Sequence, residues 1–141
     1  HRDLHSFPTR RSSDLLFVLD VGLLGAMSDL DAMSILEGND IFVEFKGALT
    51  EQYVLQQIIS DTKYTPYYYG TEKATFEQDF MIQMGKDVVP IEVKAETNLK
   101  SQSLKCYCEK YHPQKAIRFS AKKYIDQGWM KNVPLYAVCT L

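Results

Sequence analysis

The sequence has few cysteines and no long apolar run, and each shortage excludes a class of protein. Only three cysteines occur in 141 residues, too few for a disulfide framework. Cys106 and Cys108 have no second Cys/His pair with which to build a structural zinc site. No apolar run approaches the roughly 18–20 residues of a membrane-spanning helix. We therefore expect a protein of the reducing cytoplasm that is not embedded in a membrane.

The sequence also has slightly fewer basic than acidic residues. Lysine and arginine number 16 against 18 acidic residues, which gives a formal net charge of −2. This balance excludes a histone-like or polybasic nucleic-acid binder but leaves room for a local basic cleft. The Gly-x4-Gly-Lys-Ser/Thr motif is missing, since Gly85-Lys86 is followed by Asp87. We therefore expect no ATP hydrolysis from this chain alone.

Residues 1–15 differ in composition from everything that follows. Three of the four arginines lie there, whereas all twelve lysines come later. Residues 6–15 read SFPTRRSSDL, which resembles the conceptual translation of a common sequencing adapter, and no apolar core of a secretory signal is present. We interpret residues 1–15 as a non-native leader. We expect residues 16–141 to form one compact domain, the C-terminal fragment of a longer protein.

Hydrophobic periodicity and turn residues predict an α/β domain. Helices are predicted over 31–37, 41–60 and 101–111, and a turn entering a helix over 22–27. Strands are predicted over 16–20, 66–70, 75–84, 88–96, 115–120 and 133–140. Gly85-Lys86-Asp87 predicts a hairpin turn between the third and fourth of these strands. From the long helix onward the order is helix, three strands, helix, strand, with another strand at the end.

Two acidic residues stand out in the predicted hairpin. Side chains alternate along a strand, so Glu92 and Lys94 share the face opposite Ile91 and Val93. The simpler interpretation is a strand with a charged, solvent-facing side. Asp79 favours a different interpretation. Aspartate is disfavoured within strands, and strand pairing at about 4.8 Å would bring Asp79 beside Glu92. The two carboxylates can then share Mg²⁺, with the Lys94 ammonium alongside.

Glu51 lies inside the apolar stripe of the predicted long helix, where an unpaired carboxylate is costly. Its neighbours one turn away include Gly47 and Val54. One interpretation is a partly buried glutamate paired with a lysine. The other docks Glu51 against the sheet, where it completes the acidic cluster, and Gly47 permits the close approach.

Glu51 on a helix, followed by Asp79-x12-Glu92-x-Lys94, resembles the PD-(D/E)XK signature of restriction-endonuclease-like nucleases. The wider sequence is similar to the C-terminal domain of unknown function carried by bacterial and archaeal AAA-type ATPases. The matching stretches are VLDVGLL (18–24), FKGALTE (45–51), EQDFMI (77–82), PIEVKAE (90–96) and VPLYA (133–137). The resemblance covers residues 16–141 and implies a restriction-endonuclease-like αβββαβ core, a mixed sheet flanked by helices.

This resemblance also implies a role for each candidate residue. Asp79 and Glu92 would be Mg²⁺ ligands, Glu51 an auxiliary ligand, and Lys94 the group that orients the attacking water and stabilises the transition state. Glu77 is a weaker candidate. The implied function is Mg²⁺-dependent phosphodiester hydrolysis or DNA binding, with an AAA-type ATPase domain, absent from this chain, as the upstream partner. The alternative is a catalytically inactive module that binds or regulates that ATPase domain, which the net acidity and the few arginines favour.

Overall fold

The computed structural model describes residues 16–29, 40–69, 77–95 and 101–141, with side chains of the long helix described from residue 46 onward. Its centre is a six-stranded mixed sheet in the order β1-β2-β3-β4-β6-β5. The strands are β1 (Tyr67–Tyr69), β2 (Gln78–Met84), β3 (Asp87–Lys94), β4 (Ile117–Ser120), β5 (Ile125–Asp126) and β6 (Lys131–Pro134). The helices are α1 (Val21–Met27), α3 (Asp40–Asp61), α4 (Gln102–Tyr111) and the 3-10 helix η1 (Leu135–Thr140).

The β2–β3 hairpin forms as its sequence predicts. Met84 pairs with Asp87, so the loop consists of Gly85 and Lys86 alone, and Gly85 has a positive φ of 65° that suits glycine. β3 then pairs in parallel with β4, and β4 in parallel with β6. The ends of β3, β4 and β6 therefore meet at one edge of the sheet, opposite the hairpin turn.

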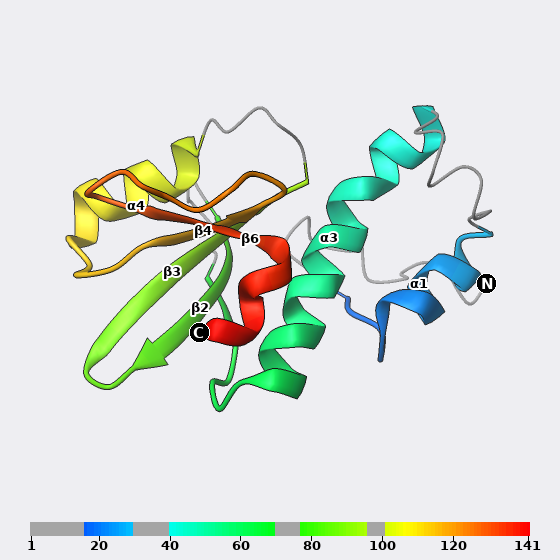
Figure 1. Ribbon diagram of the computed structural model, residues 1–141, viewed down its shortest axis with the longest axis horizontal. Helices are drawn as coiled ribbons and strands as arrows, with labels where there is room; N and C mark the ends of the chain where they lie inside the picture. Colours follow the sequence, from blue (N-terminus) through cyan, green and yellow to red (C-terminus); the bar gives the residue numbers. More distant parts are fainter. Residues whose placement is uncertain (1–15, 30–39, 70–76, 96–100) are drawn as a thin grey trace, which may run out of the picture.

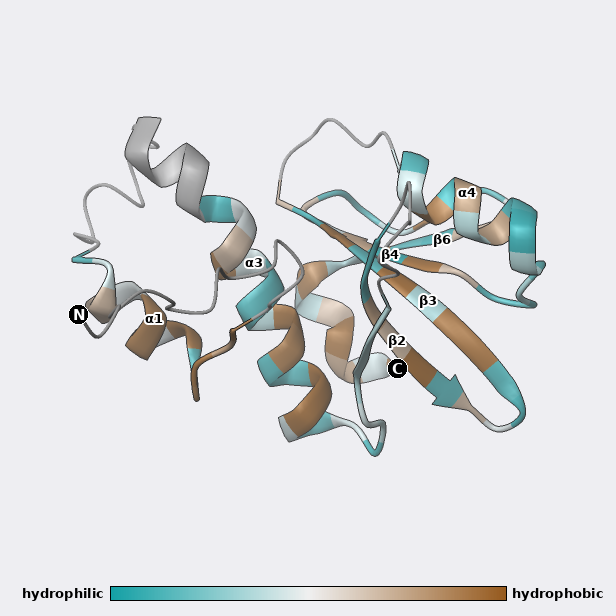
Figure 2. Ribbon diagram, turned by 180° about the vertical axis from the view of Figure 1, so that it is seen from behind, coloured by the Kyte–Doolittle hydropathy of each residue, from teal (hydrophilic) through white to brown (hydrophobic). Residues whose placement is uncertain are grey.

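The helices divide between the two faces of the sheet (Figure 1). α3 and η1 cover one face, where the main core contains Ile58, Phe80, Ile91 and Phe119. α4 covers the other face, and a smaller apolar cluster joins Leu104 to Ala116 and Met130 there. α1 packs against α3 and not against the sheet (Figure 1). Hydropathy colouring shows brown, apolar stretches along β2 and β3 that give way to teal near the hairpin turn (Figure 2).

Most predicted elements are confirmed, since α3, α4, the hairpin, β1 and β4 lie where the sequence places them, whereas α1 forms at Val21–Met27, where the sequence predicts a turn entering a helix. The predicted helix at 31–37, and the leader at 1–15, lie outside the described residues. The mixed α/β class with flanking helices is confirmed. No helix in the described ranges is long and apolar enough to cross a membrane.

One predicted strand is wrong, and another extends too far. Residues 16–20 form no strand, because the Gln52 side-chain amide of α3 binds both backbone groups of Val18, donating to its carbonyl at 2.9 Å and accepting from its N–H at 3.0 Å. The strand predicted at 133–140 ends at Pro134, and η1 follows. Tertiary contacts override local strand propensity at both places.

Candidate functional site

The predicted site residues lie at the edge of the sheet remote from the hairpin turn. Asp79 is the second residue of β2, while Glu92 and Lys94 lie among the last three residues of β3. The regular pairs between the two strands run only as far as Phe80 and Ile91. Beyond them, the Asp79 carboxylate accepts a hydrogen bond from the Val93 N–H at 2.6 Å. The Asp79 carboxylate thus accepts a hydrogen bond from a backbone N–H at the point where the regular pairing of β2 with β3 ends.

Burial makes the Asp79 carboxylate difficult to ionise. Desolvation raises its pKa from 3.8 to about 6, against the opposing effects of the Val93 N–H and the Lys94 ammonium. The neighbouring charges of Glu92 and Glu77 raise that pKa further. Asp79 therefore shares its electrostatic environment with three of the residues that the sequence singled out, although Glu77 itself is exposed.

Glu92 and Lys94 form a tight ion pair. Lys94 Nζ lies 2.7 Å from Glu92 Oε1, with the lysine side chain 35% exposed and the glutamate 6% exposed. The strand is thus not the half-exposed one with a charged outer side that composition alone suggested. The second carboxylate oxygen of Glu92, Oε2, is buried and has no hydrogen-bond partner among the described residues. An oxygen of this kind can still accept a proton donor or a cation.

Glu51 approaches the same group from α3. Its neighbours Val54 and Ile58 are fully buried, whereas Glu51 is half-buried. Desolvation first, and then the Asp79 charge, raise the pKa of Glu51 from 4.5 to about 7, while the Lys94 ammonium opposes them. Gly47 does not mark a close approach, because nothing lies within 4 Å of a Cβ placed there. The structure therefore brings Glu51, Asp79, Glu92 and Lys94 into one electrostatic neighbourhood, without the role expected of Gly47.

Arg118 is a further member of this region. Glu92 and Arg118 are register partners on β3 and β4, so their side chains share a face. Arg118 is buried and donates from Nε to Asn132 Oδ1 at 2.9 Å and from Nη1 to Ser101 Oγ at 3.1 Å. Burial lowers the pKa of Arg118, and the Glu92 carboxylate counters that effect. Arg118 therefore supplies buried positive charge behind Glu92.

The sequence did not lead us to expect this network around Arg118. One signal was available. Arg118 is the only arginine after residue 11, and it stands between isoleucine and phenylalanine in a short predicted strand. A charged residue at such a position is seldom fully buried unless it is paired. Its partner Asn132 lies 14 residues further on, at a distance that no local pattern specifies.

The chemistry of these side chains fits a hard cation. Glu51 and Asp79 are carboxyls whose negative form is disfavoured by burial, and Glu92 has an unused buried oxygen. A divalent ion would favour the ionised form of all three. Among the described residues, however, no three His, Cys, Asp or Glu side chains are arranged as a ready metal-binding group. The carboxylate oxygens therefore suit a divalent cation, but the described residues do not hold them in a ready-made coordination geometry.

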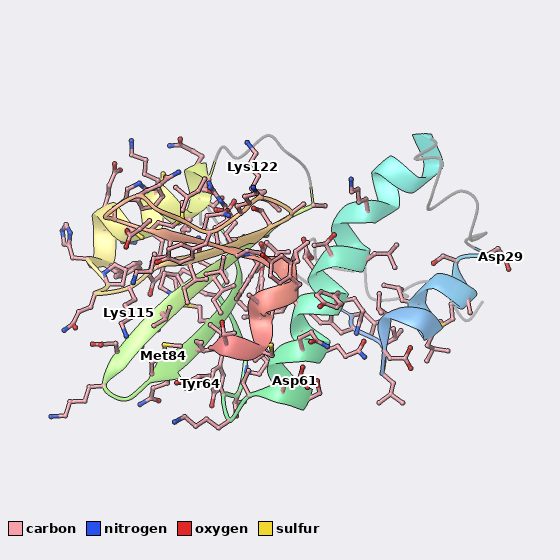
Figure 3. The ribbon with its side chains drawn as sticks, in the orientation of Figure 1. Asp29, Asp61, Tyr64, Met84, Lys115 and Lys122 are labelled. Carbon is pink, nitrogen blue, oxygen red and sulfur yellow. The ribbon has the colours of Figure 1, made fainter. Side chains whose placement is uncertain are left out.

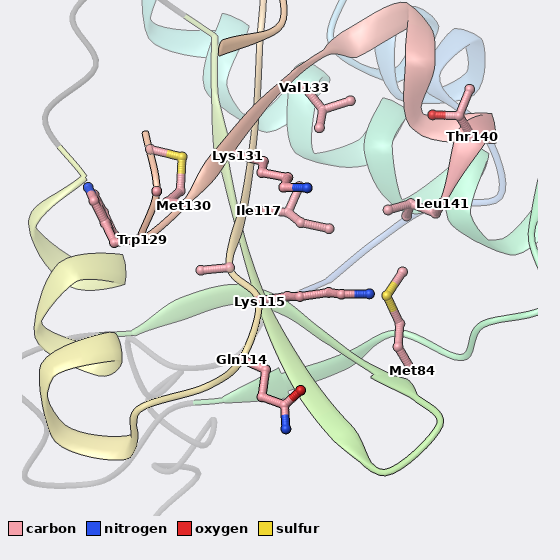
Figure 4. Close-up of a pocket in the computed structure, with 12 residues that line it drawn as sticks. Met84, Gln114, Lys115, Ile117, Trp129, Met130, Lys131, Val133, Thr140 and Leu141 are labelled. Atoms are coloured by element: carbon pink, nitrogen blue, oxygen red, sulfur yellow. The ribbon is translucent and has the colours of Figure 1, made fainter. Parts of the chain in front are cut away.

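A separate cavity of about 230 Å³ lies at the other end of the sheet (Figure 4). Met84, Ile117 and Leu141 contribute apolar side chains to its lining, and Lys115 and Lys131 contribute charge. None of the predicted site residues lines it. The cavity and the acidic group are therefore distinct features of the fold.

We call the group of Glu51, Asp79, Glu92 and Lys94 the acidic edge of the sheet. The chain is thus an α/β domain with a charged cluster where its central strands end. A family model, the domain of unknown function DUF4143, matches residues 46–139, which is more than half of the chain. The chain therefore belongs to the DUF4143 family. Comparisons with curated proteins and with solved structures gave no match.

Proposed function

We propose that this domain is a nuclease-like module that binds Mg²⁺ at Glu51, Asp79 and Glu92 and hydrolyses phosphodiester bonds of DNA. The observation that carries the proposal is that the Asp79 carboxylate on β2 interacts electrostatically with Glu51 of α3 and with the Glu92–Lys94 ion pair of β3. The element order from α3 to β4, a helix, three strands, a helix and a strand, supports a restriction-endonuclease-like core of the αβββαβ type.

Each residue has a distinct role in this proposal. Asp79 and Glu92 would hold the metal ion through carboxylate oxygens, and Glu51 would be an auxiliary ligand. Mg²⁺ would supply Lewis-acid stabilisation of the phosphoryl oxygens and a more acidic water. Lys94 would orient the attacking water and stabilise the negative charge that develops on the phosphate.

The proposal places the domain in the cytoplasm, downstream of an AAA-type ATPase domain that this chain does not include. The three cysteines Cys106, Cys108 and Cys139 are all free, which supports a reducing compartment.

Cleavage of supercoiled plasmid tests the activity. The wild-type chain should nick the plasmid with Mg²⁺ and not with EDTA. Asp79→Asn and Lys94→Ala should each lower the rate by at least a hundredfold, the order of effect seen when a group that stabilises transition-state charge is removed. Asp87→Asn, an acid on β3 at the hairpin end, should leave the rate unchanged. Equal, metal-independent nicking by wild type and Asp79→Asn would contradict catalysis at this site.

A second candidate is a non-catalytic module that binds or regulates the ATPase domain. The closed Glu92–Lys94 pair favours it, as do exposed apolar side chains next to α3: Leu16, Leu19 and Met27 are 82%, 86% and 68% exposed. This function predicts binding to a recombinant AAA-type ATPase domain that is insensitive to salt and lost in Leu19→Glu. Salt-dependent DNA binding with no such complex would favour the nuclease.

A further inference from the structure

A loop of two lysines lies directly beside the acidic edge. Ser120 is the register partner of Lys94 at the ends of β4 and β3, and residues 121–124 follow Ser120 at once. Lys122 and Lys123 in this loop are exposed. Within the described part of the chain neither of them forms an ion pair, unlike Lys94, Lys105 and Lys131. Because both side chains are exposed, a partner in solution can reach them.

Buried hydrogen bonds fix the position of this loop. Asn132 is fully buried on β6, and its Nδ2 donates to the backbone carbonyls of Lys122 at 3.4 Å and Lys123 at 3.0 Å. Ser120 Oγ accepts from the Lys122 N–H at 3.2 Å and donates to Asn132 Oδ1 at 2.8 Å. The same Asn132 oxygen accepts from Arg118 Nε. The network that lies behind Glu92 thus also holds the lysine loop.

We propose that Lys122 and Lys123 contact the phosphate backbone of a DNA duplex and hold it over the acidic edge, with Asn132 as the positioning residue for their loop. The inference rests on the proposed function and adds the contact surface for its substrate. Three acidic side chains repel a polyanion, so binding there requires cations close by. Two exposed lysines on an anchored loop, one strand away from Lys94, meet that requirement.

The chain offers a matched control at the opposite edge. Lys86 lies in the hairpin turn and Lys115 just before β4, and both are exposed. Lys86 lies six residues before Glu92, roughly 20 Å away at about 3.3 Å per residue, and Lys115 is level with Val89, three residues or roughly 10 Å before Glu92. These distances are about two and about one screening length at 0.1 M salt. Lys122 and Lys115 can be compared in Figure 3.

Fluorescence anisotropy with a labelled 20-base-pair duplex, in Ca²⁺ to prevent cleavage, tests the proposal. Lys122→Gln/Lys123→Gln should bind roughly tenfold more weakly at 0.1 M salt, and the slope of log K against log salt should fall by about 2. Lys86→Gln/Lys115→Gln should leave both quantities unchanged. Asn132→Asp, which keeps the lysines but removes their anchor, should give an intermediate loss.

Different results would overturn different parts of the account. If the wild type binds the duplex and the two lysine pairs behave alike, the lysine loop is not the contact surface, while the proposed function stands. If the wild type shows no salt-dependent binding, the proposed function fails as well. If poly-glutamate displaces the duplex as well as unlabelled duplex does at equal charge, the loop is a general polyanion surface and the DNA assignment is wrong.

Discussion

The two faces of the sheet differ in how many polar side chains they bury. The face under α3 and η1 contains Phe80, Ile91 and Phe119, all buried and apolar. The face under α4 has a smaller apolar cluster and also contains Glu92 and Arg118 in one register row, with Asn132 as the next partner on β6. Apolar burial on the first face is non-directional, whereas the buried polar groups of the second face depend on specific hydrogen bonds. The comparison indicates that the α3 face contributes most of the apolar core, whereas the α4 face also positions charge.

The apolar face should be the most sensitive to truncation. Phe119 is fully buried in the main core, so Phe119→Ala should lower the free energy of unfolding by about 3–5 kcal/mol through lost burial and a cavity. Urea denaturation followed by circular dichroism measures this change. Val88→Ala, at a half-exposed position on β3, is the control and should cost far less. Equal losses would mean that the assigned core is wrong.

Substitutions on the α4 face should have the next largest effect on the free energy of unfolding, and the effects of Arg118 and Glu92 should depend on each other. Arg118→Met removes the charge behind Glu92 and the hydrogen bonds that Arg118 donates to Asn132 and Ser101, so we expect a loss of about 3 kcal/mol. Glu92→Gln should cost less in the Arg118→Met background than in the wild type, by about 1 kcal/mol. A double-mutant cycle in urea gives this coupling. Additive losses would show that the two side chains do not interact.

The acidic edge should make stability depend on pH. The pKa of Asp79 is 3.8 in the unfolded chain and about 6 in the fold. Between these values the folded protein binds more protons than the unfolded chain, so the free energy of unfolding falls as pH rises. Asp79→Asn should remove about 1–3 kcal/mol of this decline and be more stable than wild type at pH 8. Thermal melts from pH 4 to pH 8 test it, and parallel profiles for the two proteins would contradict it.

The loss of an exposed ion pair on α4 should give the smallest change in the free energy of unfolding. Lys105 and Glu109 lie one turn apart on α4 at 3.9 Å, and both are exposed. Lys105→Ala should therefore change the free energy of unfolding by less than about 0.5 kcal/mol. A larger loss in the same urea experiment would mean that α4 contributes more through its outer side than the comparison of the two faces allows.

Local signals explain which elements the sequence predicted correctly. Gly85-Lys86 specifies a tight hairpin, and the apolar period of 3.6 residues specifies α3 and α4, so each forms with little help from distant residues. The aspartate within a strand pointed to Asp79 in the same way. These features depend on residues close together in the chain.

Distant partners explain what the sequence did not predict. Residues 16–20 are not a strand because Gln52, 34 residues away, binds the Val18 backbone. Likewise, Arg118 is buried because Asn132 and Ser101 accept its donors. The short strand β5 was not predicted, since it exists only through its pairing with β6. No pattern within a short window encodes such pairings.

Magnesium binding tests the central claim most directly, because it needs no assumption about a substrate. With a dissociation constant of about 1 mM, 10 mM Mg²⁺ would stabilise the wild type by about 1.4 kcal/mol and raise its Tm by about 3–6 °C. We expect this rise at pH 8, a smaller one at pH 5 where protons compete for Asp79 and Glu51, and none in Asp79→Asn. Asp87→Asn should behave as the wild type. An equal Tm rise in wild type and Asp79→Asn, or no rise in either, would contradict the claim that these acids hold a divalent cation.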